Sequence, residues 1–229
     1  CLPKERHGYV PVLLGTFFQQ LYNTVDAVIV GRFVGKEALA AVGGSSSQIL
    51  NLLIGFFTGV ASGAAVIVAQ YYGARDAEDS SRSVHTAMIL AIASGAIMTV
   101  VGILTAPVLL RIMATPEDTM ADSIVYMRWV YLAMIPGMVY NMGSAILRAV
   151  GDSKHPLYFL IACCLINVVL DLLFVVTFNM GVAGAAVATA LSQLLSAVMV
   201  CWFLARPKTE ESVRLELSKL RTGWELMRR

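Results

Sequence analysis

Residues 156–205 read PLYFLIACCLINVVLDLLFVVTFNMGVAGAAVATALSQLLSAVMVCWFLA, and Asp171 is the only charged residue in this stretch. A helix that crosses a bilayer needs about 20 mostly apolar residues, so the stretch is long enough for two spans, 156–178 and 181–205. Helices are expected because lipid offers no partners to exposed backbone groups, and the apolar residues do not alternate as in a membrane strand. The stretch therefore predicts two consecutive membrane helices.

Four further stretches toward the amino terminus are also long and apolar enough to span a bilayer, at about 8–30, 44–70, 85–110 and 124–147. The chain is 58% hydrophobic and 14% charged, with a mean hydropathy of +0.73. Soluble domains carry about 25% charged residues. The predicted fold class is therefore all-α: a polytopic membrane protein whose residues 1–205 form a bundle of six transmembrane helices.

The loop charges predict how this bundle is oriented. Arg32, Lys36, Arg111 and Arg128 are the basic residues on one side, whereas the other loops and the tail carry most of the remaining lysines and arginines. Basic residues concentrate on the cytoplasmic side of membrane proteins. Both termini of this multi-pass protein are therefore expected in the cytoplasm.

The tail, residues 206–229, is predicted to be a cytoplasmic amphipathic connector. Its apolar residues follow helical spacing on a basic background, as in helices that lie on a membrane surface. They are Val213, Leu217, Leu220, Trp224 and Met227. The chain begins with Cys1, shows no cleavable signal peptide and ends at Arg229 in a polar stretch. We therefore expect a fragment or a processed chain.

Small residues predict where helices approach one another closely. Gly55, Gly59 and Gly63 repeat every four residues, and Gly184 with Ala188 makes a similar pair. Such faces allow close packing of neighbouring membrane helices.

Three prolines lie inside predicted spans, at positions 11, 107 and 136. Proline removes a backbone donor and can bend its helix.

Cys163, Cys164 and Cys201 lie in apolar runs and are interpreted as small hydrophobic residues. Cys1 lies outside these runs, and the adjacent Cys163 and Cys164 show no metal-ligand spacing.

Two aspartates lie within predicted spans, where a charge costs about 2.5–3.5 kcal/mol on insertion scales and therefore calls for a function. At about 1.5 Å per residue, Asp26 lies about 6 Å, Asp171 about 10 Å and Thr189 about 12 Å from the outer end of its helix. Asn167 shares the face of Asp171, one turn deeper. The four side chains are expected to converge in the outer half of the bundle.

This predicted group contains two carboxylates, one amide and one hydroxyl, with no basic partner at the same depth. Oxygen ligands suit a hard cation such as Na⁺. Two carboxylates held close together can instead share a proton. Either event would make a cation-coupled switch. The alternative is that each aspartate only bonds to polar neighbours such as Gln20 and Asn23.

Several ordered motifs resemble the multidrug and toxic compound extrusion (MATE) transporters over nearly all of residues 8–205. They are NTVD at 23–26, VGR at 30–32, ALAAVG at 38–43, RAVGDSK at 148–154 and GVAGAAVAT at 181–189. The resemblance is to the amino-terminal six-helix lobe of the DinF-like branch, whose complete members have twelve helices. It implies a secondary antiporter that exports organic cations or other amphipathic compounds in exchange for H⁺ or Na⁺.

The same resemblance assigns roles to single residues. It implies a cation-coupling site, with possible Na⁺ binding, at Asp26, Asn167, Asp171 and Thr189, and helix bending at Pro11. It implies a location in the inner (plasma) membrane, and no cofactor other than the coupling ion. The partners it implies are the lipid bilayer, a small amphipathic substrate and either the missing carboxy-terminal lobe or a second copy of this chain.

Two alternatives remain, one within transport and one from another functional class. One is a flippase for lipid-linked saccharides from the related superfamily, although no basic residue lies at mid-span to hold an anionic head group. The other is a six-helix membrane scaffold that does not transport. An enzyme is disfavoured because neither a phosphate loop nor Ser-His-Asp spacing occurs. A net charge of +2 gives no indication of nucleic-acid binding.

Overall fold

All regular structure in the computed structural model is helical over the residues it describes, 6–206, 209 and 213–216. The elements in chain order are α1 (Arg6–Phe33), α2 (Lys36–Gly43), α3 (Ser45–Gly73), α4 (Ala77–Ile112), α5 (Glu117–Leu132), α6 (Met134–Ala149), α7 (Lys154–Asp171), the π-helix η1 (Leu172–Thr177) and α8 (Gly181–Ala205). Each predicted span coincides with one or two of these helices. The short helix α2 was not predicted.

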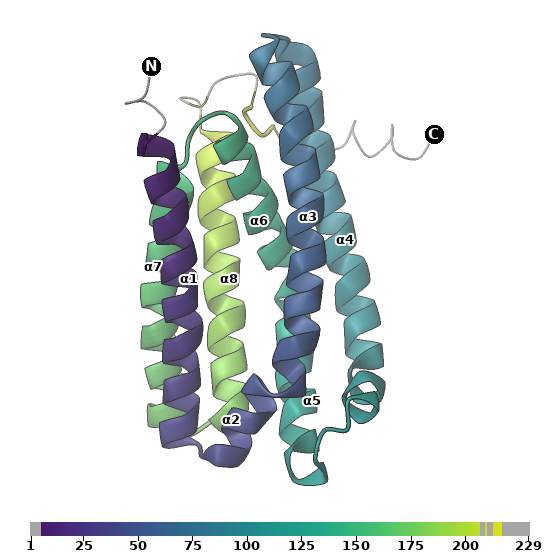
Figure 1. The fold of residues 1–229 in the computed structure, drawn as a ribbon, viewed down its shortest axis with the longest axis vertical. Helices are drawn as coiled ribbons and strands as arrows, with labels where there is room; N and C mark the ends of the chain where they lie inside the picture. Colours follow the sequence, from purple (N-terminus) through teal and green to yellow (C-terminus); the bar gives the residue numbers. More distant parts are fainter. Residues whose placement is uncertain (1–5, 207–208, 210–212, 217–229) are drawn as a thin grey trace.

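The long helices lie side by side, with α1, α7 and α8 on one side of the bundle and α3 and α4 on the other (Figure 1). Helices α6 and α8 join the two sides, because α6 packs against α3, α4 and α8, and α8 packs against α5, α6 and α7. Helix α1 begins and helix α8 ends at one end of the bundle, which we call the termini end, and α2 lies at the opposite end (Figure 1). The arrangement confirms the all-α bundle.

Four helical stretches of the described chain are long and apolar enough to cross a membrane: Lys36–Gly73, Ala77–Ile112, Lys154–Thr177 and Gly181–Ala205. The bent pair α5 and α6 makes a fifth when it is counted as one span. Helix α1 carries Gln19, Gln20, Asn23 and Asp26, which lower its hydropathy. These helices confirm a membrane protein, and the number of six crossings stays a prediction.

The predicted span at 124–147 is broken in the structure, whereas the span that contains Pro107 is continuous. Helices α5 and α6 meet at Ala133 with a bend of 46°. Pro136 has no N–H for the carbonyl group four residues earlier, which explains a break at this position. By contrast, α4 continues through Pro107 as one helix. The side chain of Pro11 lies outside the described residues, so its bending role stays a prediction.

The predicted close packing holds at Gly184 and fails at the glycines of α3. A Cβ atom built on Gly184 would lie 3.1 Å from the backbone carbonyl of Phe174, and Ala188 is fully buried. Cβ atoms built on Gly55, Gly59 and Gly63 would meet nothing within 4 Å among the described atoms. These three glycines lie on the exposed side of α3, so the prediction of a packed face there is wrong for the described chain.

Part of the tail returns to the bundle in a form that the sequence did not indicate. Residues 213–216 are not helical, and Val213 and Leu215 are buried in the same apolar cluster as α4, α6 and α8. Alternate residues facing inward are typical of extended chain. Val213 therefore does not begin the predicted amphipathic helix. The other residues of the apolar stripe, Leu217 onward, lie outside the described residues.

Candidate functional site

A pair of carboxyl groups lies where α1 packs against α7. Asp26 is 7% exposed and Asp171 is 0% exposed. Their side chains lie close enough to interact electrostatically with each other. Because two ionised carboxylates repel each other, this approach is favourable only when a proton or a cation lies between them. The structure therefore brings together the two aspartates that the sequence singled out.

Polar atoms around this pair have no donor or acceptor within the described chain. They are Oδ1 of Asp26, both carboxylate oxygens of Asp171 and both polar atoms of the Asn167 side chain. Asn167 is fully buried one helical turn from Asp171. A buried polar group without a partner costs about 1–3 kcal/mol, and more when it is charged. The oxygens of this cluster are of the kind that bind a proton, a water molecule or a hard cation.

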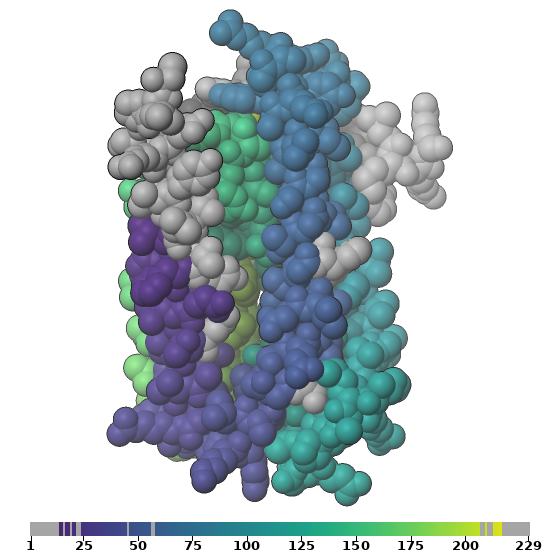
Figure 2. Space-filling model, in the orientation of Figure 1, coloured from purple at the N-terminus to yellow at the C-terminus, as the bar shows by residue number. Residues whose placement is uncertain are grey.

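Thr189 and Asp26 both line a cavity of about 510 Å³ inside the bundle. The hollow is visible between α1 and α3, with α8 behind it (Figure 2). Asn167 and Asp171 do not line this cavity. The polar side chains of the lining include Gln20, Asp26, Asn51, Tyr126, Asn141, Thr189 and Gln193. Asp26 therefore connects the buried carboxyl pair with the cavity.

Tyr126 on α5 is a member of the site that the sequence analysis missed. It is buried, lines the cavity and lies close enough to Asp26 and Asp171 to interact electrostatically with both. A tyrosine on a span is common and carries no charge, so nothing in the sequence linked it to the aspartates. Only the packing of α5 in the bundle brings its hydroxyl group to them.

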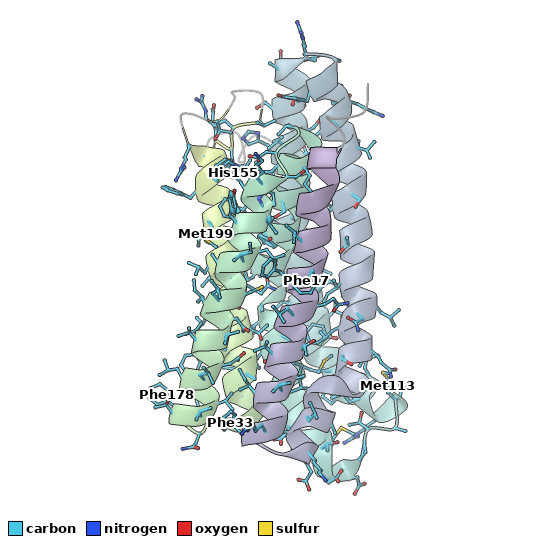
Figure 3. All side chains as sticks on the ribbon, turned by 60° about the vertical axis from the view of Figure 1, so that its left-hand side comes forward. Phe17, Phe33, Met113, His155, Phe178 and Met199 are labelled. Carbon is cyan, nitrogen blue, oxygen red and sulfur yellow. The ribbon has the colours of Figure 1, made fainter. Side chains whose placement is uncertain are left out.

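The position of Asp171 depends on the π-helical turn that follows it. Asp171 is the last residue of α7, and η1 begins at Leu172. The N–H of Phe178 donates to the carbonyl of Leu173 at 3.0 Å, a bond over five residues. The close approach at Gly184 packs this turn against α8. Phe33 and Phe178 mark the ends of the two aspartate-bearing segments, at the same end of the bundle (Figure 3). Single π-turns occur often at functional sites.

Known proteins match this chain over most of its length but over only about half of theirs. The probable multidrug resistance protein YoeA of Bacillus subtilis is 33% identical over 203 residues, which are 87% of this chain and 44% of that protein. A MATE protein solved in the bent conformation is 29% identical with a TM-score of 0.84, covering 91% of this chain and 46% of that one. A MOP-superfamily transporter from Pyrococcus furiosus, described as having a binding pocket of reverse polarity, is 28% identical with a TM-score of 0.84, covering 94% and 48%.

The MatE family matches residues 11–173, which include most of α1, all of α2 to α7 and both aspartates of the site. The relatives are transporters, and the described helices are those of a multi-pass membrane protein. The resemblance seen in the sequence motifs is thereby confirmed: this chain belongs to the MatE family of membrane transporters.

Proposed function

We propose that this chain is the cation-coupling lobe of a secondary antiporter that exports organic cations or other amphipathic compounds in exchange for Na⁺ or H⁺. One observation carries the proposal. The buried carboxyl pair of Asp26 and Asp171 has oxygens without donors, and it lies next to a polar cavity that shares Asp26.

The coupling step follows from the charge of the pair. Na⁺ or a proton bound between Asp26 and Asp171 neutralises their repulsion and lets α1 stay packed against α7. Release of the ion leaves two facing negative charges in a site of low polarity, which favours separation of the two helices. A cationic substrate in the cavity would interact with Asp26 as well. Ion and substrate would then compete for one carboxylate, as antiport requires.

No group of three or more His, Cys, Asp or Glu side chains that could hold a metal ion occurs among the described residues. We propose that Na⁺ would instead be held by oxygens of Asp26 and Asp171 together with the amide of Asn167 and the hydroxyl of Thr189. This ligand set consists of hard oxygen ligands, two charged and two neutral. Such a set suits a monovalent ion that must also be released.

The membrane arrangement belongs to the same proposal. We infer six crossings with both termini in the cytoplasm of a bacterial or archaeal cell. The start of α1 and the end of α8 lie at the same end of the bundle, which supports it. The chain spans about half the length of its relatives, which supports a second lobe, or a second copy of this chain, that completes the transport pathway. Residues 206–229 would connect the lobes.

The lining of the cavity favours cationic substrates over lipid-linked saccharides. The described lining contains one carboxylate and no Lys, Arg or His side chain. An anionic pyrophosphate head group would be held by basic residues. Tight binding of a pyrophosphate lipid, without binding of organic cations, would reverse this order.

The proposal is tested by efflux of a fluorescent organic cation from proteoliposomes that contain the complete transporter. Asp171→Asn is expected to abolish efflux driven by a Na⁺ or proton gradient and to leave the amount of protein in the membrane unchanged. Asp122→Asn is the matched control, because Asp122 is an exposed carboxylate on α5. Gradient-driven efflux by the Asp171→Asn variant at the wild-type rate would overturn the coupling role.

A further inference from the structure

The segment Val213–Glu216, which we call the strap, lies against the termini end of the bundle. The N–H of Leu215 donates to the carbonyl of Leu204 at the end of α8, at 3.0 Å. Val213 and Leu215 are buried in the apolar cluster that contains residues of α4, α6 and α8. The strap is thus fastened to the bundle by apolar contacts and by backbone hydrogen bonds.

A second backbone bond of the strap ends on a histidine. The N–H of Glu216 donates to Nε2 of His85 at 2.9 Å. The other ring nitrogen, Nδ1, lies 2.7 Å from the carbonyl oxygen of Ser81, one turn earlier on α4. His85 is only 2% exposed.

These two partners determine the protonation state of the ring. A carbonyl oxygen only accepts, so Nδ1 carries the proton that it donates to Ser81. A backbone N–H only donates, so Nε2 of His85 is unprotonated. The observed contact with the strap therefore requires the neutral imidazole. A proton on Nε2 would oppose the N–H of Glu216 and remove the bond.

We propose that His85 is a proton-operated latch that holds the strap on the bundle when the imidazole is neutral and releases it when the imidazole is protonated. Histidine is the side chain whose charge ordinarily changes between about pH 5 and 8. The strap follows α8 in the chain, so its release detaches residues 213–216 from the end of the bundle. The inference goes beyond the antiport proposal and stands on contacts of this chain alone.

Other titratable groups lie near the termini end, and their effect on pH dependence must be distinguished from that of His85. On α4, Arg82 pairs with Glu78 at 3.7 Å and with Asp79 at 3.4 Å, and in the strap Arg214 pairs with Glu216 at 3.1 Å. These carboxylates pair with arginine side chains. Further titratable side chains at this end include Tyr72 near the end of α3, Asp76 before α4, Arg148 on α6, Lys154 at the start of α7 and Cys201 on α8.

A second histidine at the same end serves as an internal comparison. His155 pairs with Asp152 and stacks on Phe203 of α8, with ring centroids 4.2 Å apart (Figure 3). Protonation of His155 at low pH could therefore also affect α8. A variant of His85 that cannot titrate distinguishes the effect of His85 from that of His155.

The test is hydrogen–deuterium exchange of the full chain in lipid nanodiscs, read by mass spectrometry on peptides that contain the amides of Leu215 and Glu216. Exchange is compared at pH 7.5 and pH 5.5 after correction for the intrinsic rates. In the wild type, protection of these amides is expected to fall about tenfold at pH 5.5, the effect of one lost hydrogen bond. In His85→Gln an amide oxygen lies near the position of Nε2, so the strap amides should stay protected at both pH values. In His85→Ala these amides should be unprotected at both pH values.

Equal wild-type protection at the two pH values would overturn the latch. The latch would also be overturned if the His85→Gln variant lost as much protection at pH 5.5 as the wild type does. In that case the titrating group would be another residue, and His155 would be the first candidate. If His85→Ala disturbs the bundle as a whole, the comparison of the wild type with His85→Gln still decides.

Discussion

Replacement of Asp171 by asparagine tests the carboxyl pair with a change of one charge and almost no change of volume. Unit charges about 4 Å apart interact by about 4 kcal/mol at an effective dielectric constant of about 20. The amide oxygen that remains can still coordinate Na⁺, so we expect about half of this energy, roughly 2 kcal/mol, to be lost. Na⁺ binding should then weaken about 30-fold.

The same substitution should have the opposite effect on stability when no cation is bound. Asp26 and Asp171 lie close enough to interact electrostatically, and the oxygens of Asp171 have no donor in the described chain. An amide at position 171 removes the repulsion and can donate a hydrogen bond to Asp26. We expect the Na⁺-free variant to be more stable by about 1–3 kcal/mol, the energy of one hydrogen bond to a charged group.

The assays are calorimetric titration with NaCl, with choline chloride as the control salt, and thermal unfolding in detergent with and without Na⁺. Asp122→Asn is again the matched variant. If Asp171→Asn binds Na⁺ like the wild type and unfolds more easily without it, Asp171 has a structural role and the reasoning fails. If the wild type binds no Na⁺ but takes up a proton between pH 5 and 8 that the variant does not, the coupling ion is H⁺.

Two further substitutions test the packing and the missed site residue. Gly102→Ala should lower the free energy of unfolding by about 2–3 kcal/mol, because the added methyl group would overlap the buried ring of Tyr131. Gly59→Ala meets nothing within 4 Å and is the control in thermal unfolding, and equal losses would contradict this account. Tyr126→Phe should weaken Na⁺ binding about tenfold in calorimetry, because it removes only a hydroxyl group near the carboxylates. Unchanged affinity would exclude Tyr126 from the site.

The sequence predicted the aspartate pair because a bilayer makes intramembrane charges rare. Asp26 and Asp171 stand out in apolar runs, and simple helical rise places them at similar depths from the same side. Tyr126 could not be found in this way, since a neutral aromatic residue is ordinary in a span. Depth along a helix is readable from the sequence, whereas rotation of one helix against another is not.

The glycines show the same limit. The spacing of Gly55, Gly59 and Gly63 correctly describes a small face of α3, but the described part of the chain places nothing on that face. Gly95 and Gly102 have no such repeat, yet a methyl group on either would collide with the neighbouring α5–α6 segment. Close packing depends on which faces meet, and a pattern within one helix does not contain that information.

By itself, the sequence determined that this protein is a helical membrane bundle and roughly where its helices lie, and it predicted a function for Asp26 and Asp171. Hydrophobic length and the cost of charge in lipid act on each segment separately, so they can be read without a fold. Only the tertiary structure decided the bend at Ala133, the π-turn after Asp171, the place of Tyr126 and the contact between His85 and Glu216. These features arise from contacts between segments, and such contacts exist only when all the helices are packed together.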